Sequence, residues 1–125
     1  MAEHYQTEQE IEAVVSGFEI CATSKEEFTH LCHLTVATYY LHDSTPDESF
    51  KKMRSGLLRF LDHHGVDKAK YSDRVTRAWL EQIQSVIEQM DGGSSLLALT
   101  NAVLQQLGEH RLSLAGQREG GAVKT

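Results

Sequence analysis

Hydrophobic residues recur at three- and four-residue steps along most of the chain, which is the pattern of amphipathic helices. The first such segment follows Thr7, which precedes a glutamate by three residues as in a helix capping box. It is expected to end near Gly17 or just past it, and residues 18–23, where polarity alternates weakly, are expected to form an extended connector. A second capping pattern at Ser24 predicts a helix that continues to about Leu41 and is apolar on nearly every side. This helix should occupy the centre of the fold.

Three further helices are predicted downstream. Thr45 is suited to cap a helix that has Pro46 at its first position, and Gly65 is suited to end it in a left-handed conformation. Residues 69–90 carry one apolar stripe that stops before a pair of glycines. One of the serines at positions 94–95 should cap the last long helix, which has a broad apolar face.

The helical pattern stops at Gly108, and the glycine-rich residues 108–125 are predicted to form a flexible tail. Residues 7–107 are then the ordered core. The full length, 125 residues, is a common size for one domain. The sequence therefore predicts a single-domain, all-α bundle of about five helices.

Charge and composition narrow the classes of partner. Asp and Glu outnumber Lys and Arg by 18 to 12, and the formal net charge is −6. Such a surface repels nucleic-acid phosphates and anionic lipid headgroups. No apolar run approaches the roughly 20 residues that cross a bilayer, and Cys21 and Cys32 are expected to be free thiols in a reducing compartment. We therefore expect a cytoplasmic protein that binds neither nucleic acid nor membranes.

The candidate chemistry gathers around the seven histidines. His30 and His33 stand three residues apart on the most apolar predicted helix, so they share one face of it. A buried imidazole needs a hydrogen bond or a ligand, because an unsatisfied buried polar group costs roughly 1–3 kcal/mol. Four residues are candidate partners of this pair: Glu19, His64, Tyr71 and Asp73.

Three interpretations of the histidine pair stay open at this stage. The two imidazoles are structural, or they line a pocket for an organic ligand, or they bind a metal. For the third, His30, His33 and Asp73 would form a set of two histidines and one carboxylate, which suits a divalent metal such as Zn or non-haem Fe. The sequence contains no four-ligand cysteine motif, nucleophile elbow, phosphate-binding loop or dinucleotide fingerprint that would favour another chemistry.

Several blocks of the chain resemble a group of small uncharacterised bacterial all-α proteins. Residues 28–37 are similar to the Thr-His-x-x-His-Leu-x-Val-Ala segment of that group, and residues 53–65 are similar to its Arg-x-Gly-Ile stretch and the His-Gly that follows. Residues 71–74 resemble its Tyr-His-Glu-Thr segment, but Ser, Asp and Arg stand at the His, Glu and Thr. Residues 111–113 resemble its Arg-Leu-x-Ser close, so the resemblance covers residues 18–118 approximately.

The resemblance implies that polar side chains from separate segments converge on one pocket between the central helix and the helix that starts near residue 71. These residues are His30, His33, Tyr71, Asp73, Thr76 and Arg111. The two imidazoles would form hydrogen bonds or ligate a metal, and Tyr71 would supply a phenol. A carboxylate would come from Asp73 or Glu19, and Arg111 would pair with an anion.

Three functions are compatible with these observations. The first is a small-molecule-binding protein with an internal polar pocket around His30 and His33. The second is a metal-dependent or imidazole-based enzyme at the same site, and the two differ in whether the ligand is turned over. The third is a structural or homodimeric interaction module, because the apolar faces within residues 75–107 are broader than a small bundle is expected to bury.

Overall fold

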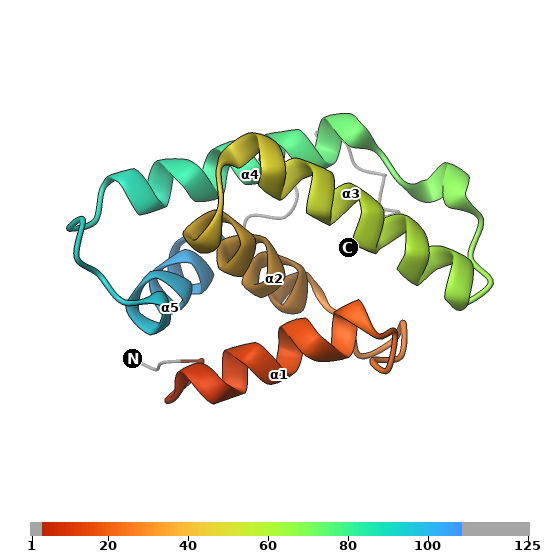
Figure 1. The fold of residues 1–125 in the computed structure, drawn as a ribbon, viewed down its shortest axis with the longest axis horizontal. Coiled ribbons are helices and arrows are strands. Elements are labelled where there is room, and N and C mark those ends of the chain that lie inside the picture. Colours follow the sequence, from red (N-terminus) through yellow and green to blue (C-terminus); the bar gives the residue numbers. More distant parts are fainter. Residues whose placement is uncertain (1–3, 109–125) are drawn as a thin grey trace.

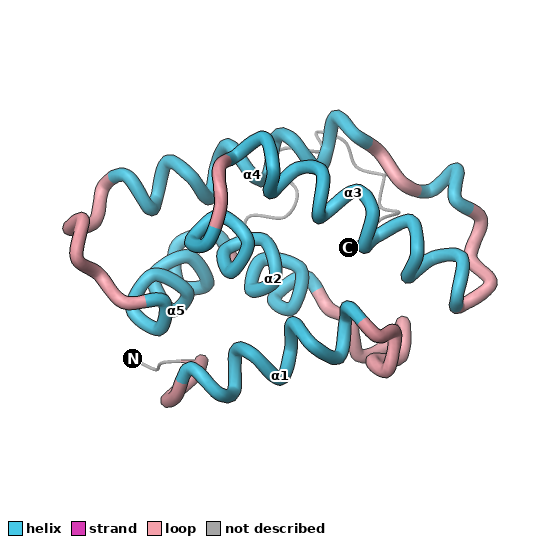
Figure 2. Tube along the Cα trace, viewed as in Figure 1, coloured by secondary structure: helices cyan, strands magenta, loops and turns pink. Residues whose placement is uncertain are grey.

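A computed structural model describes residues 4–108, which form five α-helices and one short 3₁₀ turn (Figures 1 and 2). The elements in chain order are α1 (Glu8–Glu19), α2 (His30–Asp43), α3 (Pro46–His63), η1 (Lys68–Lys70), α4 (Asp73–Glu88) and α5 (Leu96–Leu107). No strand occurs within residues 4–108. The prediction of an all-α bundle of about five helices is therefore confirmed.

Helix α2 lies at the centre of the fold and packs against all four other α-helices (Figure 1). Nine of its 14 residues are buried. Its two buried threonine hydroxyls bond within the helix: Oγ1 of Thr35 donates to the carbonyl of Leu31, and Oγ1 of Thr38 donates to the carbonyl of Leu34. Local bonds of this kind allow a polar residue to be buried without an unsatisfied group. The expectation of a central helix that is apolar on nearly every side is confirmed.

The connection between α1 and α2 differs from the prediction. Helix α1 starts with the predicted capping box at Thr7 and ends at Glu19, just past Gly17 as predicted. Cys21 then adopts a left-handed φ of 59°. Residues 18–23 therefore form a helix end and a tight turn, and the prediction of an extended connector was wrong. The weak alternation of polarity there reflects a turn that buries Phe18 and Cys21, so it did not indicate extended backbone.

The predicted start of the central helix was also wrong. Ser24 does exchange capping hydrogen bonds with Glu27, but only one turn follows. Thr29 then acts as a second cap and accepts a hydrogen bond from the next turn, so that α2 begins at His30. Phe28 and the cap residue Thr29 are not helical. In this conformation the ring of Phe28 stacks on that of Phe18, with 4.9 Å between the centroids. Tertiary packing of this ring thus decides between two local caps.

The predicted boundaries of the later helices are largely confirmed. Thr45 caps α3, Gly65 has a φ of 71° after it, and Ser95 caps α5. Helix α4 starts later than predicted, because residues 68–70 form the separate turn η1 and Ser72 is the cap of α4. Helices α3 and α4 pack side by side in opposite directions (Figure 1).

The broad apolar faces within residues 75–107 are buried inside this chain. Trp79, Ile83 and Val103 belong to the core, and the large hydrophobic residue that stands exposed within residues 4–108 is Ile20, at 70%. These faces therefore do not require a second copy, and the homodimer stays a prediction. The predicted tail lies outside the described residues except for Gly108. Within the described part of the chain, no helix combines the length and the apolar character that crossing a membrane requires.

Gly56 sets the distance between α1 and α3. A Cβ atom at this position would stand 2.6 Å from Cε2 and 2.8 Å from Cζ of Phe18. The Phe18 ring is fully buried, stacked on Phe28 and in contact with Phe60 at a centroid distance of 5.7 Å. The ring therefore has little room to move away from the backbone of α3.

We expect Gly56→Ala to lower the free energy of unfolding by roughly 1–2 kcal/mol. Overpacking a tight core costs about 1–3 kcal/mol, which exceeds the gain of at most about 1 kcal/mol from placing alanine in a helix. Urea denaturation followed by far-UV circular dichroism measures the difference. Gly92→Ala is the control, because no atom lies within 4 Å of its added Cβ. A Gly56→Ala protein as stable as the wild type would show that Phe18 is free to shift.

Candidate functional site

A cavity of about 470 Å³ lies between the first turn of α2 and the last turn of α5. Its volume falls in the range of roughly 300–1,000 Å³ that is typical of small-molecule pockets. Leu31 and Leu104 supply apolar surface, and His30 is the most deeply buried polar side chain in the wall. The described residues that line it are His4, Thr29, His30, Leu31, Leu104, Gln105 and Gly108.

His30 is held in the cavity wall by two other helices. It is the first residue of α2 and only 8% exposed. In the tautomer with a hydrogen on Nε2, this atom donates to the carbonyl of Leu107 on α5, at 3.4 Å. The ring also meets Trp79 of α4 edge to face, with 4.9 Å between centroids. Contacts to α4 and α5 therefore orient the imidazole, and Nδ1 of this tautomer is an acceptor.

His33 lies one turn further along α2 and is buried to the same degree. Its ring packs beside Phe28, with 5.9 Å between centroids. Burial, and secondly the charge of the nearby His30, lower the pKa of His33 to about 4. His33 is therefore a neutral imidazole at neutral pH. The structure brings the two histidines close enough to interact electrostatically, as predicted, but gives them different neighbours.

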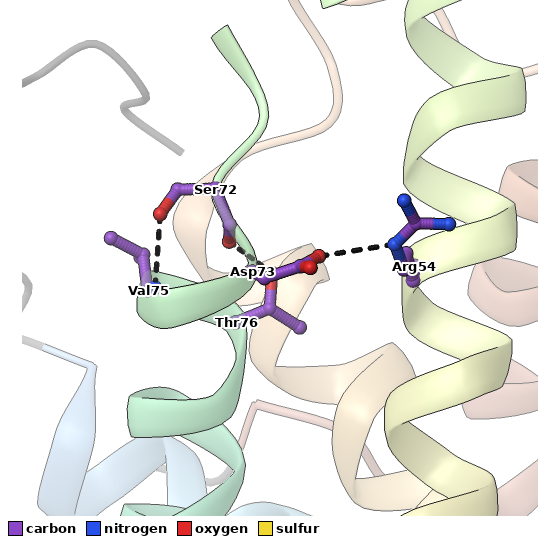
Figure 3. A network of polar contacts seen from close by, with 5 residues as sticks. All are labelled: Arg54, Ser72, Asp73, Val75 and Thr76. Atoms are coloured by element: carbon purple, nitrogen blue, oxygen red, sulfur yellow. Dashed lines mark hydrogen bonds and ion pairs between the residues drawn. The ribbon is translucent and has the colours of Figure 1, made fainter. Parts of the chain in front are cut away.

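Two other predicted site residues, Asp73 and Thr76, lie in the first turn of α4 (Figure 3). The carboxylate of Asp73 pairs with Arg54 of α3, with 3.1 Å between Oδ1 and Nε. Oγ1 of Thr76 donates to the carbonyl of Ser72, the residue that caps α4. Both partners of the Asp73–Arg54 pair are about half exposed, so the pair contributes little to stability.

The hydroxyl of Tyr71 is buried beside this cluster. Among residues 4–108 it finds no hydrogen bond of good geometry, although it lies close enough to Thr76 and Asp73 for both to influence it. Burial, with a smaller contribution from the Asp73 carboxylate, raises the pKa of Tyr71 to about 12. Tyr71 therefore keeps its proton throughout the neutral pH range.

The predicted site residues are thus divided between two places. His30 lines the cavity between α2 and α5. Asp73 and Thr76 lie in the first turn of α4, Tyr71 lies just before it, and none of the three is in the described lining of the cavity. Arg111 lies outside the described residues. The expected convergence of one polar pocket between α2 and α4 stays a prediction.

Two candidate partners of the histidine pair bond elsewhere. The carboxylate of Glu19 accepts a hydrogen bond of 2.6 Å from the hydroxyl of Tyr40. Nε2 of His64 lies 3.0 Å from the carbonyl oxygen of Thr23, the distance of a hydrogen bond. Both contacts anchor the connection between α1 and α2.

The neutral imidazole of His33 is the protonation state that ligates metals. Within residues 4–108, however, no three His, Cys, Asp or Glu side chains form a group that could hold a metal ion. Asp73 pairs with Arg54 instead of joining His30 and His33. Binding of a divalent metal by these residues therefore stays a prediction.

Sequence reasoning missed most of the cavity lining. The carbonyl of Leu107, which meets His30, belongs to the backbone and leaves no signal in a side-chain pattern. Gln105 and His4, which also line the cavity, belong to no distinctive motif. The partner of Asp73 could have been suspected from the sequence, because Arg54 belongs to a run of basic residues on the predicted third helix that could pair with a carboxylate.

Comparisons of the chain with family models, with curated proteins and with solved structures each found no match. The resemblance to the bacterial all-α group therefore stays a prediction from the sequence blocks.

The buried His33 predicts a pH dependence of stability. The pKa of an unfolded histidine is about 6.5, and that of folded His33 is about 4. As the pH falls below 6.5, the unfolded chain binds a proton that folded His33 does not, so the free energy of unfolding falls until the folded pKa is reached. Between pH 7.5 and pH 5 we expect a loss of about 2 kcal/mol from this residue.

Urea denaturation at a series of pH values tests this expectation. His33→Gln should flatten the dependence between pH 7.5 and pH 5, because glutamine does not titrate. His63→Gln is the matched control, since His63 is exposed, and it should keep the slope of the wild type. An unchanged slope in His33→Gln would place the titration elsewhere.

Proposed function

We propose that this protein binds a small organic molecule in the cavity between α2 and α5. One observation carries the proposal: a cavity of about 470 Å³ has in its wall the buried and oriented imidazole of His30. Ligand pockets combine mostly apolar walls with a few fixed polar groups. His30 is such a group, because Trp79 and Leu107 hold it in place before any ligand arrives.

The lining indicates the chemistry of the ligand. The described residues of the wall include no Asp, Glu, Lys or Arg, so they offer no ion pair to a strongly charged molecule. Leu31 and Leu104 suit an apolar body, while His30 and the amide of Gln105 suit one or two hydrogen-bonding groups. The ligand class that fits best is a compact, mainly apolar molecule with a neutral polar substituent.

Binding is better supported than turnover. A catalytic imidazole acts together with a nucleophile, a second acid or base, or a metal. The described lining holds neither a cysteine nor a carboxylate, and the hydroxyl of Thr29 is engaged in capping α2. We therefore assign His30 the role of a recognition group.

Two tryptophan variants on neighbouring positions of α5 test the site. Gln105 and Gln106 are both exposed, but only Gln105 belongs to the described lining of the cavity. We expect a thermal-shift screen of small neutral metabolites to find compounds that raise the melting temperature of the wild type and of Gln106→Trp. Gln105→Trp should abolish the shift, because the indole fills the mouth of the cavity.

A compound that stabilises Gln105→Trp and Gln106→Trp equally would bind outside this cavity and would contradict the proposal. A screen without any stabilising compound would favour a purely structural role for His30. Far-UV circular dichroism of both variants shows whether each has kept the helical fold.

The enzyme alternative has its own test. Elemental analysis of tag-free protein, purified without a chelator, is compared with the double variant His30→Ala, His33→Ala. If the organic-ligand proposal holds, neither protein carries Zn or Fe in a stoichiometric amount. Stoichiometric metal in the wild type that disappears in a folded double variant would instead establish a metal site on these two histidines.

A further inference from the structure

Helices α3 and α4 are offset along their shared interface. The two helices run antiparallel, and Arg54 of α3 contacts Asp73 of α4. One turn towards the start of α3 and the end of α4, Cζ of Arg77 lies 3.7 Å from the centroid of the Phe50 ring. Helix α3 begins at Pro46, only one more turn away. The last two turns of α4 therefore extend beyond the start of α3, as Figure 1 shows.

A groove of about 400 Å³ lies at this step, separate from the cavity that His30 lines. Phe50 and Leu80 are its buried apolar components. On the α4 side, residues at three- and four-residue spacing along one face of the helix line the groove. On the other side, residues at the start of α3 line it. The lining consists of Pro46, Asp47, Phe50, Arg77, Leu80, Glu81, Gln84, Ser85 and Glu88.

The groove has an acidic rim. Three carboxylates line it, against one guanidinium, and Arg77 already lies over the ring of Phe50. Asp47 has an exposed partner, Lys51, at 3.6 Å. Within residues 4–108, Glu81 and Glu88 form no ion pair, and the last turn of α4 contains no basic residue to offset the negative end of its dipole.

We propose that this groove docks a basic segment of a partner protein, with a lysine or arginine side chain laid along it. The aliphatic stem of that side chain would cover Phe50 and Leu80, and its charge would lie between Glu81 and Glu88. Long basic side chains combine an apolar stem with a charged end in this way. Charge complementarity thus selects a cationic occupant for an apolar groove.

The length of the groove favours a peptide segment as the source of this charge. The stripe on α4 runs from Arg77 to Glu88, which spans about 16 Å at the helical rise of 1.5 Å per residue. An extended segment of about five residues covers that distance at roughly 3.3 Å per residue.

Fluorescence anisotropy with the full chain tests the proposal. The probe is a labelled peptide of about eight residues in which lysine and leucine alternate, at fixed ionic strength. We expect saturable binding that Glu81→Gln, Glu88→Gln weakens at least ~10-fold. The control pair Glu12→Gln, Glu26→Gln removes the same charge from exposed positions outside the groove and should change the affinity less than ~2-fold.

A second pair of variants tests the shape of the groove without changing charge. Ser85 and Gln82 are both exposed on α4, and only Ser85 lies in the groove. Ser85→Trp should lose binding of the peptide, whereas Gln82→Trp should keep it. Equal losses in the two charge-removing pairs would mean that the peptide senses only the net charge. Equal losses in those two pairs would overturn the proposal. Undiminished binding of the peptide to Ser85→Trp, or no measurable binding to the wild type, would also overturn it.

Discussion

The burial of α2 on all sides is the constraint on which the rest of the structure depends. A helix that is covered by four others needs apolar surface in every direction, and each polar group that it carries must be satisfied locally or stay uncharged. The threonines of α2 meet this requirement through bonds to their own helix. The two histidines depend on other elements: His30 bonds to the backbone of α5, and His33 stays neutral beside the ring of Phe28.

The positions of these histidines along α2 explain their different roles. His33 lies one turn inside the helix among aromatic rings, so burial keeps its imidazole neutral and makes it part of the core. His30 lies at the end of the helix, where α2 and α5 diverge and leave a cavity. Burial thus lowers the pKa of His33 and leaves it uncharged. The contacts of His30 with Leu107 and Trp79 instead fix the orientation of its ring at the cavity wall. The orientation of His30 thus follows from the packing of α4 and α5 against α2.

Both proposed binding surfaces lie where one helix of a packed pair ends and its neighbour continues. The cavity forms where α2 begins beside the end of α5, and the groove forms where α4 extends past the start of α3. Close packing fills the space between helices along their shared length but not beyond it. The two surfaces differ in charge, because the described cavity lining is neutral and the groove is acidic. They therefore suit different classes of ligand.

The sequence by itself determined the fold class and most helix boundaries, because caps and amphipathic spacing act within a few residues. Thr7, Thr45 and Gly65 each stand where their local signal places them. Local signals failed where distant contacts competed, as between Ser24 and Thr29, since the choice there depends on the ring of Phe28. Only the tertiary structure decided the neighbours of the predicted site residues. Asp73 pairs with Arg54 because of how α3 and α4 are aligned, and His30 bonds to a backbone carbonyl of α5. Neither the alignment of two helices nor a backbone group can be inferred from the pattern of side chains.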